Sequence, residues 1–336
     1  MKKLFIAMMA MAAFAACSNE EPVASLQGDA IAFGDAFVDN ATKAIYGEDA
    51  NLTAIQVWGN VVQTGSTNTP VALYGTAGVP VTGTAYNTLW NCDVVRYWTP
   101  SCTFNFLAIA HGYVAERDVV NGIPTKISYT ANTANGDDLL LATPVVATTD
   151  NSGAPITGVT TVQSEKVVAF TMNHLLSRIA FKFANNAGNA DYKYNVTDIK
   201  VYGTYTSGVY TITPGQGETE GWGSQTGSLA VENALTFNGI TELAYTATTA
   251  AEGAYVIIPG DPELTITFNT EVVFNGAVIG TTPHTITLNQ TLEDTDKTFA
   301  PNTSYTFTVE LPKPGAEIKF SVSEVSGFGN QEATIQ

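Results

Sequence analysis

The residues best suited to acid-base or metal chemistry in this chain are three scattered histidines. His111, His174 and His284 are each isolated among apolar or hydroxyl residues, whereas a catalytic or metal site needs several such groups to converge. The sequence also lacks HExxH, CxxC, GxSxG and GxxxxGK patterns. We therefore predict no catalytic residue, no cofactor and no metal, and a protein that is not an enzyme. For His174, where one alternating apolar register gives way to another, we expect a structural role at a bulge or strand start.

Two acidic groups offer weaker alternatives. The cluster from Glu293 to Asp296 could bind Ca²⁺, but it lacks the glycine of an EF-hand loop, and a solvated loop explains it as well. Asp137 and Asp138 precede an apolar run, where turn formation competes with the paired-carboxylate chemistry of glycosidases. The sequence favours the structural interpretation in both cases.

Cysteine chemistry is limited to three residues, Cys17, Cys92 and Cys102. Cys92 and Cys102 flank a turn predicted at residues 99–101, whose centre lies nearer Cys102, so a simple hairpin would not place them opposite each other. Both a disulfide and a pair of buried free thiols remain open.

Cys17 follows an N-terminal segment with the features of a secretion signal. Lys2 and Lys3 precede an apolar run that is too short to span a bilayer, and small residues come directly before the cysteine. The segment resembles a bacterial lipobox, which implies cleavage after residue 16, a lipid on the Cys17 thiol and a tether over residues 17–26. Residues 18–21 are similar to the acidic surface-export tag of Bacteroidetes lipoproteins. We therefore expect an outer-membrane protein at the cell surface, with a periplasm-facing position as the alternative.

The composition indicates a β-rich chain outside the cytoplasm. The formal net charge is −17 and there are three arginines, so nucleic acid and anionic surfaces are poor partners. Charged residues make up 13% of the chain, while Thr, Gly, Ala, Val and Asn are abundant. Such a balance suits sheets that place Thr outward and large aliphatic residues inward.

Apolar residues alternate with a period of two from end to end, which predicts many short strands separated by Gly, Pro, Asn and Asp turns. The predicted strands cover residues 55–62, 102–109, 167–172, 177–183, 196–205, 254–258, 264–268, 285–288, 304–311 and 318–322. The length suits two domains, which we place at residues 27–165 and 166–336. Residues 213–228 are predicted to be a long loop inside the second domain.

A series of short motifs, in order, resembles the fimbrillin family of Bacteroidales, the subunit-like proteins of type V pili. The lipobox is followed by 31–38, by Thr42-Lys43-Ala44 and by Thr103 to Ala108. Further similar segments are 138–142, 174–181, 301–307 and 318–322. The resemblance covers nearly the whole chain. It implies two tandem transthyretin-like β-sandwich domains, an all-β fold, and a precursor whose first strand is removed by a trypsin-like protease.

Removal of a strand would expose a groove that a strand of the next subunit fills. The candidate removable strand is 31–38, in which Ile31, Phe33 and Phe37 alternate, and Lys43 is the first basic residue after the signal. Well-known members are cut after arginine, whereas no arginine precedes Arg96 in this chain, which argues against arginine-specific processing. Cleavage after Lys43 remains open.

The C-terminal segment, residues 317–336, is the candidate donor strand because Ile318, Phe320 and Val322 alternate. The same residues could instead complete the sheet of their own domain. We expect the partners to be other pilus subunits and a host or bacterial surface ligand. The alternative function is that of a monomeric surface lipoprotein that binds glycans. Its sugar-stacking candidates, which could equally lie in the core, are Trp90, Tyr97, Trp98 and Trp222.

Overall fold

The structure is a computed structural model of the 336-residue chain. It describes residues 29–38, 52–83, 88–110, 114–131, 138–213, 215, 218–288 and 298–326. Across these residues the regular elements are β-strands and one short 3₁₀ helix, Val231–Asn233. The predicted all-β fold class is therefore confirmed, and no helix in the described ranges has the length and apolar character needed to cross a membrane.

The first half of the chain forms most of an 11-stranded sheet, here called the N-terminal sheet. The strand order along the sheet is β1-β13-β9-β6-β2-β4-β5. Four further strands pair with members of this series or with each other: β3, β10, β11 and β12. Its strands are β1 (Ala32–Val38), β2 (Ala54–Gln63), β3 (Val71–Ala72), β4 (Val79–Thr82), β5 (Asn91–Cys92), β6 (Cys102–Ala110), β9 (Leu140–Ala142), β10 (Val145–Thr149), β11 (Pro155–Thr157), β12 (Thr160–Val162) and β13 (Glu165–His174).

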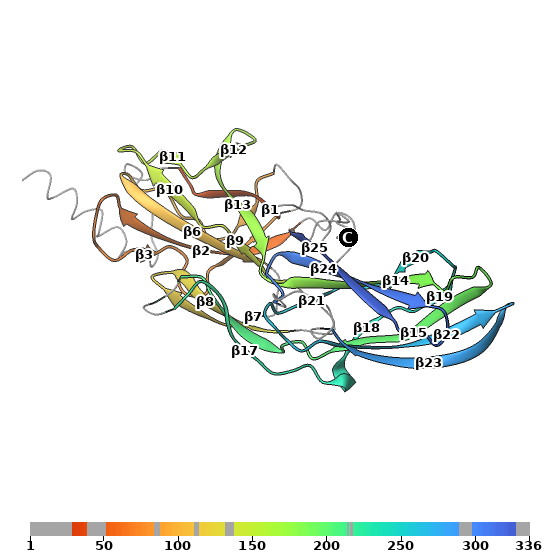
Figure 1. Cartoon of the computed structure of the whole chain (residues 1–336). Coiled ribbons are helices and arrows are strands. Elements are labelled where there is room, and N and C mark those ends of the chain that lie inside the picture. Colours follow the sequence, from red (N-terminus) through yellow and green to blue (C-terminus); the bar gives the residue numbers. More distant parts are fainter. Residues whose placement is uncertain are drawn as a thin grey trace, which may run out of the picture.

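The second half forms two five-stranded sheets that face each other, here called the C-terminal sandwich. One sheet contains β14 (Ser177–Asn186), β20 (Thr248–Ala250), β21 (Tyr255–Ile257), β24 (Thr303–Pro312) and β25 (Lys319–Ser326). The other contains β15 (Tyr192–Tyr202), β18 (Leu235–Phe237), β19 (Ile240–Leu243), β22 (Thr265–Phe274) and β23 (Ala277–Thr287). Figure 1 shows this sandwich extending to the right of the N-terminal sheet.

A four-stranded sheet, here called the junction sheet, draws strands from both halves of the chain. Its order is β17-β16-β8-β7, with β7 (Val114–Val120), β8 (Ile123–Thr130), β16 (Ser207–Thr211) and β17 (Gly221–Thr226). The predicted loop at 213–228 was therefore wrong for β17, whose glycine-rich sequence hides its pairing with β16. The chain changes sheet between β13 and β14, at Leu175 and Leu176, which is C-terminal to the boundary predicted near residue 165.

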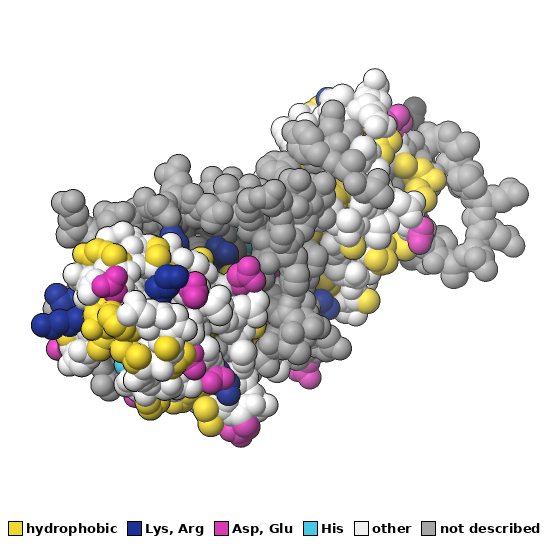
Figure 2. Space-filling model, turned by 90° about the vertical axis from the view of Figure 1, so that its right-hand side faces the viewer, with side chains coloured by type: hydrophobic (Ala, Val, Ile, Leu, Met, Phe, Trp, Pro, Cys, Tyr) yellow, Lys and Arg dark blue, Asp and Glu magenta, His cyan; other side chains and the backbone are white. Residues whose placement is uncertain are grey.

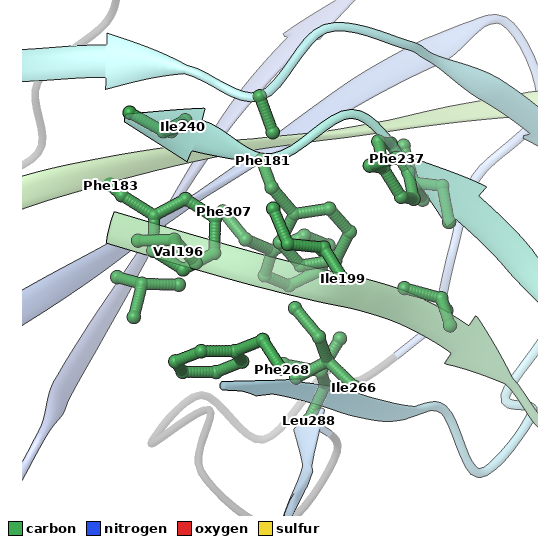
Figure 3. Close-up of a cluster of buried hydrophobic side chains, with 14 of the residues drawn as sticks. Phe181, Phe183, Val196, Ile199, Phe237, Ile240, Ile266, Phe268, Leu288 and Phe307 are labelled. Carbon is green, nitrogen blue, oxygen red and sulfur yellow. The ribbon is translucent and has the colours of Figure 1, made fainter. Parts of the chain in front are cut away.

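Three apolar cores match the three sheet systems. The core of the C-terminal sandwich is built from inward-facing residues of both sheets, including Phe181, Phe183, Phe268 and Phe307, and Figure 3 shows these rings packed together. A second core lies inside the N-terminal sheet, which wraps around it. The third lies between the opposite face of β2 and β6 and the junction sheet, and it takes Ile258 from the second half.

Candidate functional site around strand β1

Strand β1, the predicted removable strand, lies in the N-terminal sheet beside β13. The two strands run parallel, with Ala32 opposite Val167 and Phe33 opposite Val168. The register shifts between Phe33 and Ala36, and pairing then resumes with Ala36 opposite Phe170 and continues to Val38 opposite Met172. About 135 residues separate the partners along the chain, so the pairing depends on tertiary structure.

The other side of β1 is paired with residues 90–98. The amide N of Ile31 donates to the carbonyl O of Arg96 at 2.7 Å, and Trp98 N donates to Asp29 O at 3.0 Å. Further along, Trp90 N donates to Phe33 O at 2.9 Å. Strand β1 is therefore held by backbone hydrogen bonds on both sides. We call the position between β13 and residues 90–98, filled by residues 31–38, the β1 slot.

The slot is lined by the core of the N-terminal sheet. Phe33 is 1% exposed, and its ring centroid lies 6.0 Å from that of Phe106 and 6.2 Å from those of Tyr74 and Phe170. Ile31 and Ala36 are also buried. Burying an aliphatic or aromatic side chain of this size contributes roughly 1.5–3 kcal/mol, so β1 is an integral part of this core. The side chain of Phe37, the third residue of the predicted alternation, lies outside the described residues.

Gly34 lies in β1 where the side chain of Val167 in β13 occupies the space beside its backbone. A Cβ atom at this position would lie 2.6 Å from Cγ2 of Val167 and 3.4 Å from Cγ2 of Val162. A valine side chain is stiff about χ1, so Val167 cannot easily move aside. The slot therefore accepts a strand with an aromatic residue followed by a residue without a side chain. This restriction was not predicted, although a glycine inside an alternating strand is a known sign of close backbone approach.

The 90–98 segment is itself anchored by side chains. The Arg96 Nε atom donates to Leu73 O at 2.7 Å, and the guanidinium lies 5.9 Å from the ring centroid of Tyr74. Burial raises the pKa of the Tyr74 hydroxyl. Trp98 packs edge-on against Phe104, with ring centroids 4.8 Å apart. Because the segment is fixed in this way, its backbone can present a second hydrogen-bonding edge to β1.

Of the candidate donor residues, Phe320 and Val322 lie in β25, which pairs antiparallel with β24 of the same chain, and Ile318 directly precedes it. Ile318 and Val322 are half-buried and pack against the core of the C-terminal sandwich. Phe320 pairs with Val309 through the backbone, and its side chain lies outside the described residues. In this structure the alternating residues complete the sheet of their own half. Residues 327–336, the rest of the predicted donor segment, lie outside the described part.

Processing and lipidation were predicted at Lys43 and Cys17, and both residues lie outside the described ranges. Cys92 and Cys102 are free thiols; Cys102 is buried and Cys92 half-buried. Within the described part of the chain, no cluster of three or more His, Cys, Asp or Glu side chains could hold a metal ion. The acidic cluster at 293–296 and His111 lie outside the described residues.

The two described histidines make structural contacts. His174 ends β13 and its Nδ1 contacts the Asp138 carboxylate. His284 lies over the ring of Phe268, and its Nε2 is 2.8 Å from Thr270 Oγ1. Burial lowers the pKa of His284.

The proposed sugar-stacking aromatics are mostly packed inside the protein. Trp90 and Trp98 are buried in the N-terminal core. Trp222 packs against Tyr129 and Tyr210 in the junction sheet, and its Nε1 donates to Leu175 O at 2.6 Å. Tyr97 is 41% exposed. These positions give Trp90, Trp98 and Trp222 a structural role.

The chain is all-β, and its N-terminal strand β1 is paired with the rest of the chain on both sides. The fimbrillin-like family model matches residues 42–326, and the chain belongs to that family. Its fold is similar to that of a fimbrial protein from Bacteroides vulgatus ATCC 8482, with 14% identity, a TM-score of 0.54, and coverage of 88% of this chain and 99% of the other.

A fimbrilin from Porphyromonas gingivalis W83 is also similar, with 10% identity, a TM-score of 0.45, and coverage of 91% of this chain and 99% of the other. Comparison with curated proteins finds no match. Membership of the fimbrillin-like family supports a structural role as a pilus subunit at the cell surface.

Proposed function

We propose that this protein is a structural subunit of a cell-surface pilus, with a role in adhesion, and that it assembles by strand exchange. Proteolysis after Lys43 separates the N-terminal strand from the body, β1 leaves its slot, and the C-terminal segment of another subunit takes its place. Before processing, a lipid on Cys17 anchors the precursor in the outer membrane.

The observation that carries this proposal is the position of β1. Its side chains fill a pocket in the core, and its backbone bonds to β13 and to residues 90–98. An empty slot would expose apolar surface together with unpaired backbone groups on two sides. Both costs are relieved at once by an incoming strand, which gives assembly a clear driving force.

The division into two tandem domains is part of the same proposal. We place the boundary at Leu175 and Leu176, where the chain changes sheet. Hydrogen bonds that join the halves near this point include the Trp222 bond to Leu175, Ala131 N to Thr206 O at 2.9 Å, and Ile212 N to Thr125 O at 2.8 Å. With β8 paired to β16, these contacts make a stiff junction that suits a subunit of an extended polymer.

Surface charge is consistent with protein partners rather than nucleic acid. Figure 2 shows Lys and Arg side chains standing among Asp and Glu side chains on the face it presents. With a net charge of −17, binding to a phosphate backbone would be opposed by long-range repulsion.

Limited trypsin treatment tests the proposal. The cut should fall after Lys43, and the trimmed protein should convert from monomers to oligomers in size-exclusion chromatography. The matched control is Lys43→Gln, which removes the cleavage site and should keep the protein monomeric. N-terminal sequencing of protein recovered from cells should show a start near Ala44. Trimmed protein that stays monomeric at high concentration would contradict strand exchange.

A further inference from the structure

We infer that strand β23 is a sheet edge blocked against pairing with a second copy of this chain, and that Pro283 is the residue that blocks it. Strand β23 (Ala277–Thr287) is 11 residues long and, in the described part of the chain, pairs with β22 alone. Figure 1 shows it along the lower margin of the C-terminal sandwich. The block operates in the uncut chain and does not depend on strand exchange.

Strand β23 otherwise has the properties of an edge that another strand could extend. Every residue from Ala277 to Pro283 is exposed. The β-branched side chains of Val278 and Ile279 are 53% and 58% exposed. A long exposed edge with apolar β-branched side chains is a template for pairing with another chain. Without a protecting feature, two copies of this protein would therefore associate through β23.

The pairing with β22 fixes which backbone groups of β23 point to the open edge. Pro283 lies opposite Asn269. In an antiparallel pair, opposite residues alternate between those that exchange hydrogen bonds and those that do not. Pro283 has no N–H to donate, so it belongs to the second kind, and its backbone position faces outward. Thr281 and Thr285 lie two residues away on either side and share this direction, so the proline interrupts the row of outward donors.

A β-bulge interrupts the same edge a second time. Val272 lies opposite Gly280 and Val273 lies opposite Val278, so Ile279 has no residue opposite it. A bulge bends the strand and increases its twist, which disturbs any further pairing. Between the bulge and Pro283, Thr281 is the residue whose N–H points outward. An incoming strand would therefore meet no two successive donors between the bulge and Thr285.

Other edges of the molecule are protected in different ways. The opposite edge of the same sheet consists of β18 and β19, which are 3 and 4 residues long. Strand β7, at one edge of the junction sheet, carries the exposed charged residues Glu116, Arg117 and Asp118 in succession. Short strands, charges, bulges and proline are the common protections of sheet edges. Strand β23 is long and contains no Asp, Glu, Lys or Arg, so its protection falls to the bulge and the proline.

A second copy would meet β23 about a two-fold axis, because antiparallel pairing of a strand with itself is self-complementary. With the axis at position 283, Thr281 of one copy lies opposite Thr285 of the second copy, and the two prolines lie opposite each other. Both hydrogen bonds of this central pair are missing, because neither proline can donate. Pro283 therefore acts at the centre of the pairing that it prevents.

Restoring the donor in the uncut full chain tests the block. Pro283→Thr supplies the missing N–H and a β-branched side chain, and the ladder to β22 is unaffected because the restored N–H points outward. We expect the dimer Kd, measured by sedimentation equilibrium, to fall about tenfold or more relative to the wild type, because two hydrogen bonds are regained. Pro283→Val should behave in the same way, and the Thr281 amide should exchange more slowly in both variants as the protein concentration rises.

Pro283→Lys is the matched control, because it also restores the N–H but places two ammonium groups opposite each other across the axis. Like charges directly opposite in a sheet are destabilising, so this variant should remain monomeric. Circular dichroism establishes that each variant is folded. Folded Pro283→Thr and Pro283→Val proteins that dimerise no more than the wild type would overturn the block. Equal dimerisation of Pro283→Lys and Pro283→Thr would overturn the two-fold pairing centred on residue 283.

Discussion

Strands β1 and β25 are both terminal strands rich in alternating apolar residues, yet the structure uses them differently. Strand β1 is paired on both sides and buries Phe33 to 1% exposure. Strand β25 ends its sheet in the described part of the chain, pairs with β24, and leaves Val322 half-buried. The first strand fills a hole in a core, whereas the second extends an existing sheet.

This difference indicates which strand can drive assembly. A strand that fills a hole leaves a shaped vacancy when it departs, and the vacancy selects its replacement by shape. A strand at the margin of a sheet leaves a shallower surface, which selects less strongly. The proposed strand exchange therefore assigns the acceptor role to the N-terminal half of the chain.

The largest expected effect comes from truncating the side chains that fill each position. Phe33→Ala should lower the free energy of unfolding of the N-terminal half by about 3–5 kcal/mol, because it leaves a cavity between three rings. Val322→Ala should cost about 1 kcal/mol, because that side chain is half-buried. Thermal and urea unfolding of the uncut chain measure both values. If Val322→Ala lowered the free energy of unfolding more than Phe33→Ala, then β25 and not β1 would make the larger contribution to its core.

A smaller effect is expected from adding one methyl group to β1. Gly34→Ala should cost about 1–3 kcal/mol, because the new Cβ overlaps the Val167 side chain. Adding Val167→Ala should relieve the overlap, so the coupling between the two substitutions in a double-mutant cycle should be favourable. Gly280→Ala, at an exposed position of β23 where nothing lies within 4 Å of the added Cβ and φ is not in the left-handed region, serves as the comparison and should change stability little.

The side-chain contacts that hold residues 90–98 in place should contribute less to the free energy of unfolding than the packing of β1 does. Arg96→Met keeps most of the apolar stem but loses the bond to Leu73 O and the contact with the Tyr74 ring. We expect a loss of about 1–2 kcal/mol. Hydrogen exchange should show it as faster exchange of the Ile31 amide, which donates to Arg96 O, with no change in the amides of β24. If Arg96→Met changed the exchange of the Ile31 amide and of the β24 amides by the same factor, residues 90–98 would not be what holds this side of β1.

The smallest effect concerns pH and should be confined to the C-terminal sandwich. Burial holds the folded-state pKa of His284 below its ordinary value of 6.5. The unfolded chain therefore binds the proton more readily, and the free energy of unfolding should fall as the pH drops below about 6.5. His284→Gln should lose that part of the pH dependence in urea titrations from pH 8 to pH 5. The protection of β1 should be the same in both proteins.

Part of the candidate site could be predicted from the sequence. The alternation of Ile31 and Phe33 predicted a buried strand, and Phe33 is among the most buried residues of the core. The pairing of β1 with residues 90–98 could not be predicted, because Trp90 and Trp98 carry no local signal for their strand partner. The requirement for Gly34 depends on Val167, which is remote in sequence and reaches β1 only through the parallel register.

The sequence by itself determined the all-β fold and most strand positions, because the two-residue period of a strand is a local property of neighbouring side chains. It also determined the absence of recognisable catalytic motifs, which depend on residue type and spacing. The tertiary structure alone decided which strands lie side by side. It placed β13 in the first sheet, joined β8 to β16 across the junction, and enclosed β1 between two distant segments. Backbone hydrogen bonds look alike at every residue, so strand partners are chosen by the packing of the whole chain.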